Sequence, residues 1–193
     1  MASFDAYEAL LRRWQKSINL IGESTLDDLW RRHFLDSGQI LRHLPQSYDA
    51  LYDIGSGAGF PGLILALLGS PAVNLVESDQ RKCTFLREAA RLTGATVNII
   101  PCRAEALTPP PAGWPVRRVI VARAVAPLDL FLDFARPLID SQTLCVMLKG
   151  SRAEAELDAA RKRWHFRLLT APSLTDPKGV ILILSNLIGV SST

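Results

Sequence analysis

Three alternating glycines constrain what this chain can fold into more than any other feature. The stretch ALYDIGSGAGFPG, residues 50–62, has a short apolar lead, then Gly55, Gly57 and Gly59, then an apolar run opened by Pro61. Glycine lets a backbone take positive φ and approach a ligand closely, and proline suits the first turn of a helix. A helix N-terminus favours anionic groups. The segment therefore predicts a strand, a turn and a helix start that form a binding site for a nucleotide-like cofactor.

The glycines match two cofactor patterns. Gly57, Gly59 and Gly62 form the GxGxxG of dinucleotide-binding proteins. Gly55, Gly57 and Gly59 also form a GxGxG with Asp53 two residues before it, which resembles the first motif of S-adenosylmethionine (SAM) methyltransferases. SAM carries an amine and a sulfonium, so a nearby acid favours it, whereas a pyrophosphate gains nothing from one. We therefore favour SAM and expect Asp53, Gly55 and Gly57 to bind it; a glycine turn that binds nothing is the remaining alternative.

The first part of the chain has the periodicity of helices. One stripe of apolar side chains at helical spacing is formed by Phe4, Tyr7, Leu11, Trp14 and Ile18. A second helix is expected from residue 24 or 25, and a third over 33–44, stopped by Pro45. Residues 1–48 are therefore predicted to form an N-terminal helical extension.

From residue 49 onward, strands alternate with helices in the order β-α-β-α-β-loop-β-α-β-α-β-β. The loop is the proline-rich segment 108–115. This alternation predicts a mostly parallel sheet covered on both faces, and the last two strands form a hairpin. We expect an α/β fold, Rossmann-like as in class I SAM-dependent methyltransferases, with a mostly parallel seven-stranded sheet. Residues 49–193 would be the SAM-binding domain.

The composition indicates the cellular compartment of the protein and the kinds of partner that it permits. The net charge of +3 permits a nucleic-acid partner without requiring one, and the excess of Lys and Arg lies in residues 51–193, which hold sixteen against twelve Asp and Glu. The three cysteines are far apart and odd in number, which indicates reduced, mostly buried thiols and no metal site. No leader and no run long enough to cross a bilayer is present, so we expect a cytoplasmic protein without a membrane anchor.

In this architecture a cofactor binds at the carboxyl ends of the parallel strands. Glu77 ends the second strand eighteen positions after Gly59, where an acid can accept both ribose hydroxyls, and Asp79 is its nearby rival. Ala104 and Glu105 follow the third strand, where a backbone N–H and an acid can hold an adenine edge; a simple cap is an equal alternative for Glu105.

Two cationic residues and a histidine–aspartate pair complete the set of candidate site residues. Arg123 follows the fourth strand and Lys149 the fifth, so both are expected at the mouth of the cleft. His33 and Asp36 are three residues apart, hence on one face of a helix. Spacing alone favours an ordinary surface pair for them over a functional one.

Seven ordered motifs then resemble one family. They are WQKSINL (14–20), RHFLDS (32–37), DIGSGAGFPG (53–62), RKCTFL (81–86), RAEAL (103–107), ARAVAPL (122–128) and LKG (148–150). Together they cover nearly the whole chain and are similar to the RsmG (GidB) family, bacterial methyltransferases of guanine N7 in the 16S ribosomal RNA. One departure is Arg117-Arg118, where the family has an acid; we expect this to be a surface change.

We expect a monomer without a metal that acts on 16S rRNA within the small ribosomal subunit. The resemblance implies a SAM-dependent methyltransferase of that RNA. It places cofactor contacts on Gly55, Phe60, Ala104, Glu105 and Arg123. N7 of guanine has a lone pair and no proton at neutral pH, so no catalytic acid or base is assigned.

The resemblance also favours a functional role for His33 and Asp36, because the family has this motif beside the cleft. From their places at the cleft we expect Arg123 to organise it and Lys149 to hold a phosphate or O6, so all four residues are assigned to substrate binding. A SAM methyltransferase of a small molecule and a non-catalytic nucleotide-binding module are the alternatives.

Overall fold

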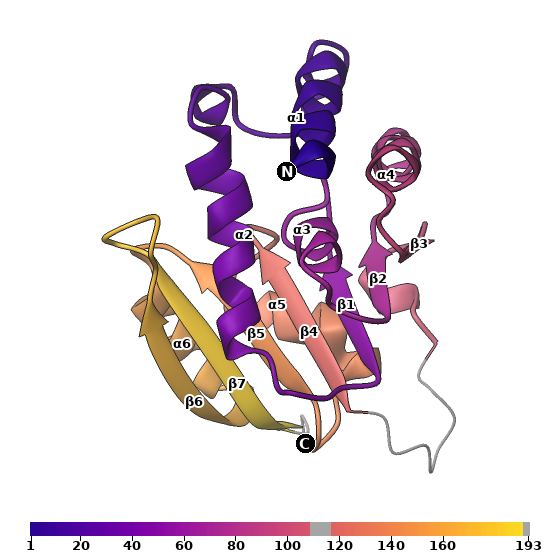
Figure 1. Cartoon of the computed structure of the whole chain (residues 1–193). Helices are drawn as coiled ribbons and strands as arrows, with labels where there is room; N and C mark the ends of the chain where they lie inside the picture. The colour runs from indigo at the N-terminus through magenta and orange to yellow at the C-terminus, as the bar shows by residue number, and fades with distance from the viewer. Residues whose placement is uncertain (109–116, 191–193) are drawn as a thin grey trace.

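A seven-stranded sheet organises the chain, with strand order β3-β2-β1-β4-β5-β7-β6 (Figure 1). The computed structural model describes residues 1–108 and 117–190. The strands are β1 (Ala50–Ile54), β2 (Val73–Val76), β3 (Val97–Ile100), β4 (Arg118–Arg123), β5 (Leu144–Lys149), β6 (Trp164–Pro172) and β7 (Val180–Gly189). Strands β1 to β5 are parallel, whereas β7 runs antiparallel to both β5 and β6. The predicted α/β fold, with its C-terminal hairpin, is confirmed.

Helices cover both faces of this sheet (Figure 1). The longer ones are α1 (Ala2–Gln15), α3 (Gly62–Leu67), α4 (Gln80–Thr93), α5 (Leu128–Ala135) and α6 (Ala153–Arg161). Short turns are η1 (Glu23–Thr25), η4 (Ala104–Ala106) and η5 (Arg136–Leu138). The N-terminal helices, α3 and α4 share one hydrophobic core on one face, and α5 and α6 pack in a second core on the other.

The second predicted helix is wrong as placed: only the short turn η1 lies near residue 24, and residues 26–28 form a bend and a turn. A continuous helical run begins at Trp30 instead. It consists of η2 (Trp30–Leu35), α2 (Asp36–Gly38) and η3 (Gln39–His43), because no proline or glycine interrupts the first two turns. The predicted break before His33 is therefore wrong. The η2 segment is π-helical, a local geometry that is frequent at functional sites.

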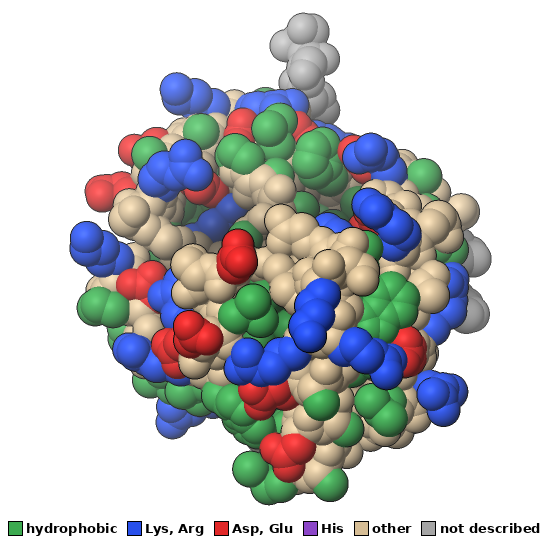
Figure 2. Space-filling model, turned by 90° about the horizontal axis from the view of Figure 1, so that it is seen from above, with side chains coloured by type: hydrophobic (Ala, Val, Ile, Leu, Met, Phe, Trp, Pro, Cys, Tyr) green, Lys and Arg blue, Asp and Glu red, His purple; other side chains and the backbone are tan. Residues whose placement is uncertain are grey.

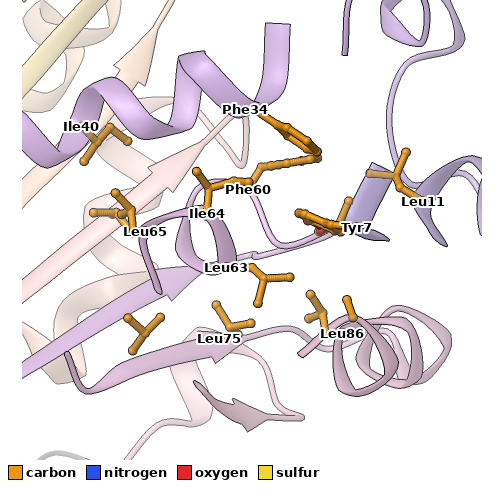
Figure 3. Close-up of a cluster of buried hydrophobic side chains, with 14 of the residues drawn as sticks. Tyr7, Leu11, Phe34, Ile40, Phe60, Leu63, Ile64, Leu65, Leu75 and Leu86 are labelled. Carbon is orange, nitrogen blue, oxygen red and sulfur yellow. Dashed lines mark hydrogen bonds between the residues drawn. The ribbon is translucent and has the colours of Figure 1, made fainter. Parts of the chain in front are cut away.

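Aromatic packing joins the N-terminal helices to the glycine loop (Figure 3). The Tyr7 ring lies 5.4 Å from that of Phe34 and 5.6 Å from that of Phe60. The Tyr7 hydroxyl is fully buried and donates a hydrogen bond to the backbone carbonyl of Ala58 inside the loop. Because this core is shared between the two parts of the chain, α1 packs against the glycine loop and helps to position it. The division at residues 48 and 49 stays a prediction.

The WQKSINL motif shapes the turn that follows α1. Trp14 Nε1 donates to Glu88 Oε2 of α4 at 2.9 Å. The Gln15 amide oxygen accepts the backbone N–H groups of Leu20 and Ile21 at 2.9 and 3.1 Å, and its Nε2 donates to the Ile21 carbonyl at 2.9 Å. One glutamine side chain thus replaces the backbone hydrogen bonds that this turn lacks, and it fixes a segment that borders the cavity described below.

Three further expectations concern single segments. The predicted loop 108–115 lies outside the described residues except for its first position. Cys83 and Cys145 are buried and Cys102 is half-buried, all as free thiols, as predicted. No helix within the described ranges is long and apolar enough to cross a membrane.

The expectation that Arg117-Arg118 is a surface change is wrong for Arg118, which is buried. Arg117 is exposed, but Arg118 is 5% exposed and pairs with Asp140. Position 118 opens β4, in which residues 118–122 are all buried. A strand buried on both faces leaves no exposed side for its first residue.

Candidate active site

A cavity of about 830 Å³ opens at the carboxyl ends of β1, β4 and β5. Figure 2 views the molecule from this side, where the surface is hollowed and Lys and Arg side chains stand among Asp and Glu. The predicted residues that line the cavity are His33, Asp36, Gly55, Gly57, Phe60, Arg123 and Lys149. Its volume lies within the range of small-molecule sites, roughly 300–1,000 Å³.

The glycine loop is held by the end of the neighbouring strand. The N–H groups of Gly55 and Ser56 donate to the Val76 carbonyl at 2.9 and 3.1 Å. The φ of Gly57 is +57°, and a Cβ at this position would meet only the Gly55 carbonyl, at 3.8 Å. The backbone of Gly57 is therefore both left-handed and open to the cavity, as a loop that receives a ligand requires.

Glu77 supports this loop from beneath. Its Oε2 accepts the Gly57 N–H at 2.9 Å and its Oε1 accepts the Asp79 N–H at 2.8 Å. Asp79 caps α4, because its Oδ1 accepts the N–H groups of Arg81 and Lys82 at 2.8 and 3.2 Å. Asp79 therefore caps the helix, and Glu77 is the acid in contact with the loop. The role of Glu77 at the ribose stays a prediction.

Asp53 occupies a different place from the one expected. Its side chain is fully buried and does not line the cavity. Oδ2 accepts the Gly62 N–H at 2.9 Å, and Oδ1 has no hydrogen-bond partner among the described residues. A Cβ on Gly62 would lie 2.6 Å from the Asp53 Cβ, so the glycine permits this close approach. The carboxyl group joins β1 to the start of α3, and the electrostatic argument for SAM does not apply to this geometry.

Burial raises the pKa of Asp53 from 3.8 to about 7, against the opposing effect of its hydrogen bonds and of Arg123. The folded state then binds more protons than the unfolded state between about pH 4 and pH 7, so this carboxyl group lowers stability as pH rises through that window. We expect the free energy of unfolding of Asp53→Asn, relative to the unchanged protein, to increase from pH 4 to pH 7.

Urea unfolding at a series of pH values measures this difference. His33 has the opposite effect, because its lowered pKa makes stability rise with pH between about 3 and 6.5. Taking the difference between variant and unchanged protein cancels the histidine contribution. A difference that stays constant across the window would contradict the raised pKa of Asp53.

Four predicted cofactor residues do not line the cavity: Asp53, Glu77, Ala104 and Glu105. Ala104 is buried and Glu105 is exposed, both in the η4 turn after β3, and neither lines the cavity. Their contacts with an adenine ring stay predictions.

Arg123 is the centre of the polar cluster in the cavity. Nη1 donates to the Arg32 carbonyl at 2.9 Å and lies 3.4 Å from Asp36 Oδ2, and Nη2 donates to His33 Nδ1 at 2.6 Å. The guanidinium carbon lies 4.9 Å from the centre of the Phe60 ring, a cation–π distance. Burial lowers the pKa of Arg123, and Asp36 opposes that effect. The pair predicted from spacing thus meets Arg123, and the surface alternative for it is wrong.

The hydrogen bonds around His33 have one consistent direction. Burial, followed by the charges of Arg123 and Arg32, lowers its pKa from 6.5 to about 3, so the ring is neutral. Because Nδ1 accepts from Arg123, the ring proton is assigned to Nε2, which donates to Thr25 Oγ1 at 2.7 Å. Thr25 in turn donates to the Gly22 carbonyl at 2.6 Å. His33 therefore holds the guanidinium as an acceptor and is not poised as a base near neutral pH.

Lys149 is already paired. Its Nζ donates to the Ala126 carbonyl and to Glu156 Oε2, each at 2.7 Å. Glu156 Oε2 also accepts the Leu128 N–H at 3.0 Å, at the start of α5. Lys149 faces the cavity, but its charge is neutralised, so it fits the wall of the site better than a free phosphate contact.

Sequence reasoning missed the loop between β6 and β7. Thr175 is 4% exposed although it lies in a loop, and its hydroxyl donates to Asp36 Oδ1. Gln39 is 3% exposed and contacts the same carboxylate at 3.0 Å. The segment reads simply as a proline and glycine turn between two late strands, and its closeness to residue 36 depends on the antiparallel β7 that brings it to the cavity.

Sequence comparison places the chain with one family of known proteins. The family model GidB, described as rRNA small subunit methyltransferase G, matches residues 1–179. The chain is similar to the ribosomal RNA small subunit methyltransferase G of Rhodospirillum centenum, at 49% identity over 94% of this chain and 82% of the relative. It is equally similar to that of Paramagnetospirillum magneticum, at 49% over 92% and 84%.

A solved structure with the same fold is a TehB-like SAM-dependent methyltransferase from Corynebacterium glutamicum. It shares 12% identity with a TM-score of 0.59, covering 93% of this chain and 97% of that one. At this identity the likeness concerns the fold alone.

Proposed function

The chain belongs to the rRNA small subunit methyltransferase G family, and from that premise we propose that it transfers the methyl group of SAM to N7 of a guanine in 16S rRNA. SAM-dependent methylation of small-subunit rRNA is the activity of the family. The target atom, action on the small ribosomal subunit in the cytoplasm, and a monomeric state are the parts that we add. No cluster of three or more His, Cys, Asp or Glu side chains suited to a metal occurs in residues 1–108 and 117–190.

The cavity fits a SAM-sized ligand. Its wall offers the open backbone of Gly57, with Glu77 behind it and the Phe60 ring beside it. These residues would hold the cofactor, with the carboxylate of Glu77 as acceptor for the ribose. When bound, SAM supplies an electrophilic methyl group, and the chain's own residues orient the acceptor toward it.

One observation carries the proposed reaction: His33 and Asp36 meet Arg123 at the same cavity as the glycine loop. A guanidinium has five N–H donors and no acceptor, and the protein uses only some of those of Arg123. Guanine presents N7 and O6 as acceptors on one edge. Arg123 can therefore orient a guanine without removing a proton, which N7 does not carry. Holding the reacting atoms in line is then the main contribution of the protein.

Transfer of a tritiated methyl group to 30S subunits and to naked 16S rRNA tests the proposal. Digestion of the product to nucleosides should yield N7-methylguanosine. Another methylated nucleoside would refute the target atom, and methylation of a small molecule with no rRNA product would refute the substrate. Preferred labelling of naked rRNA would remove the assembled subunit from the proposal.

Three cations at the cavity are expected to bind the RNA backbone. Arg32, Lys82 and Arg152 line the cavity, and none of them forms an ion pair within the described part of the chain. Each substitution by glutamine should weaken rRNA binding and reduce the slope of log K against log salt by about 0.7–1, the contribution of one phosphate contact.

Filter binding at several salt concentrations measures this slope. Arg167, which is exposed on β6 and does not line the cavity, provides the matched control as Arg167→Gln. A slope that changes as much in the control as in Arg152→Gln would show that general charge, and not this rim, binds the RNA.

A further inference from the structure

The β6–β7 loop lines the cavity and closes a ring of hydrogen bonds with the helical run. Gln39 Nε2 donates to both Asp36 Oδ1 and Ser173 Oγ, at 3.0 and 3.2 Å. Gln39 Oε1 accepts the Leu174 N–H at 2.8 Å. The amide of this buried glutamine thereby ties the loop to the helix from which Asp36 projects.

Thr175 completes the ring. Ser173 Oγ and Thr175 Oγ1 are 3.0 Å apart, and the Thr175 hydroxyl is a donor to Asp36, which as a carboxylate can only accept. Ser173 must therefore donate to Thr175. The direction of every bond converges on one oxygen, Asp36 Oδ1.

The other oxygen of the Asp36 carboxylate faces Arg123. Asp36 Oδ2 lies 3.4 Å from Arg123 Nη1, and both side chains are 16% exposed. With Oδ1 held by two donors, the carboxylate cannot rotate without breaking the ring. The orientation of Asp36, and with it one side of the guanidinium, depends on a hydroxyl that lies 139 residues further along the chain.

We propose that Thr175 is a positioning residue for methyl transfer: its hydroxyl fixes Asp36, and Asp36 in turn orients Arg123. This role rests on the proposed function only in that methyl transfer to rRNA is its readout. The hairpin added at the antiparallel edge of the sheet is thus part of the active site and not only an extension of the fold.

Removing the hydroxyl with little change of shape tests the role. Thr175→Val should lower the single-turnover rate of methyl transfer about tenfold, the effect of one charge-assisted hydrogen bond. The affinities for S-adenosylhomocysteine and for 30S subunits should change less than twofold. Thr175→Ser, which keeps the hydroxyl, should restore most of the rate. Thr170→Val, at an exposed threonine of β6, is the matched control.

A double-mutant cycle separates positioning from a general structural effect. In an Asp36→Ala background the same Thr175→Val change should alter the rate less than twofold, because its target carboxylate is gone. An equal tenfold loss in both backgrounds, or no rescue by serine, would overturn the proposal. If Thr175→Val unfolds the protein, Ser173→Ala, which removes the donor to Thr175, should give the same dependence on Asp36.

The readout is total tritium transferred to rRNA, which does not depend on the atom that is methylated. A wrong target atom would appear in the nucleosides formed by the unchanged protein, and a wrong role for Thr175 would appear only in the cycle.

Discussion

Arg123→Lys is expected to lower the single-turnover rate of methyl transfer by about 100-fold or more, while the protein stays folded. Lysine retains a positive charge beside Asp36, so the carboxylate is not left unpaired. It loses the planar fork with which Arg123 donates to His33 and to the Arg32 carbonyl at once. The charge then has no fixed direction over Phe60, and a misplacement of about 1 Å at a reacting centre can cost on the order of 100-fold.

Arg136→Lys is a control at an arginine with similar partners but greater exposure, 54% against 16% for the Arg123 side chain. The Arg136 guanidinium carbon lies 4.6 Å from the Trp164 ring centre, and Nη2 lies 3.3 Å from Asp133 Oδ1. It therefore has the same kind of partners as Arg123 but does not line the cavity. Rapid-quench methyl transfer and thermal unfolding should be measured on both variants. Equal rates for Arg123→Lys and the unchanged protein would reduce Arg123 to a structural cation.

The sheet and the cavity at the carboxyl ends of its strands could be predicted because they depend on local signals. Apolar strands, helical stripes and the positive-φ glycines each occupy a short stretch, and the rule that ligands bind at the carboxyl ends of strands converts their order into a site. Gly55, Gly57, Phe60 and Arg123 follow from that rule or from the family motifs, and all four border the cavity.

Contacts between distant segments could not be predicted in the same way. Asp53 follows an apolar strand, where an acid that contacts a cofactor is expected. Its side chain is instead directed toward the backbone of Gly62, which approaches it closely. The pairing of Thr175 with Asp36 depends on how far the β7 hairpin reaches past the sheet. The charge of Lys149 is neutralised by Glu156 from the next helix. In each case the residue type is visible in the sequence, but its partner comes from elsewhere in the chain.

Glu77 is expected to show the largest effect on cofactor affinity. Both of its carboxylate oxygens accept backbone N–H groups, Oε2 from Gly57 and Oε1 from Asp79, and the side chain is 8% exposed. Glu77→Ala should weaken binding of S-adenosylhomocysteine by about 10- to 100-fold, or roughly 1–3 kcal/mol, the cost of leaving such groups unpaired. Isothermal titration calorimetry measures this affinity directly.

Glu77→Gln distinguishes the carboxylate from a merely polar side chain. An amide has one acceptor oxygen, so its NH₂ group must face either the Gly57 N–H or the Asp79 N–H, donor against donor. The glutamine variant should therefore lose nearly as much affinity as the alanine variant. Glu88→Gln is the control, because Glu88 also accepts two donors, Trp14 Nε1 and Arg13 Nη2, but lies away from the cavity. If Glu77→Gln binds the ligand as tightly as the unchanged protein, neither the loop nor the ribose requires the carboxylate, and another group must hold the cofactor.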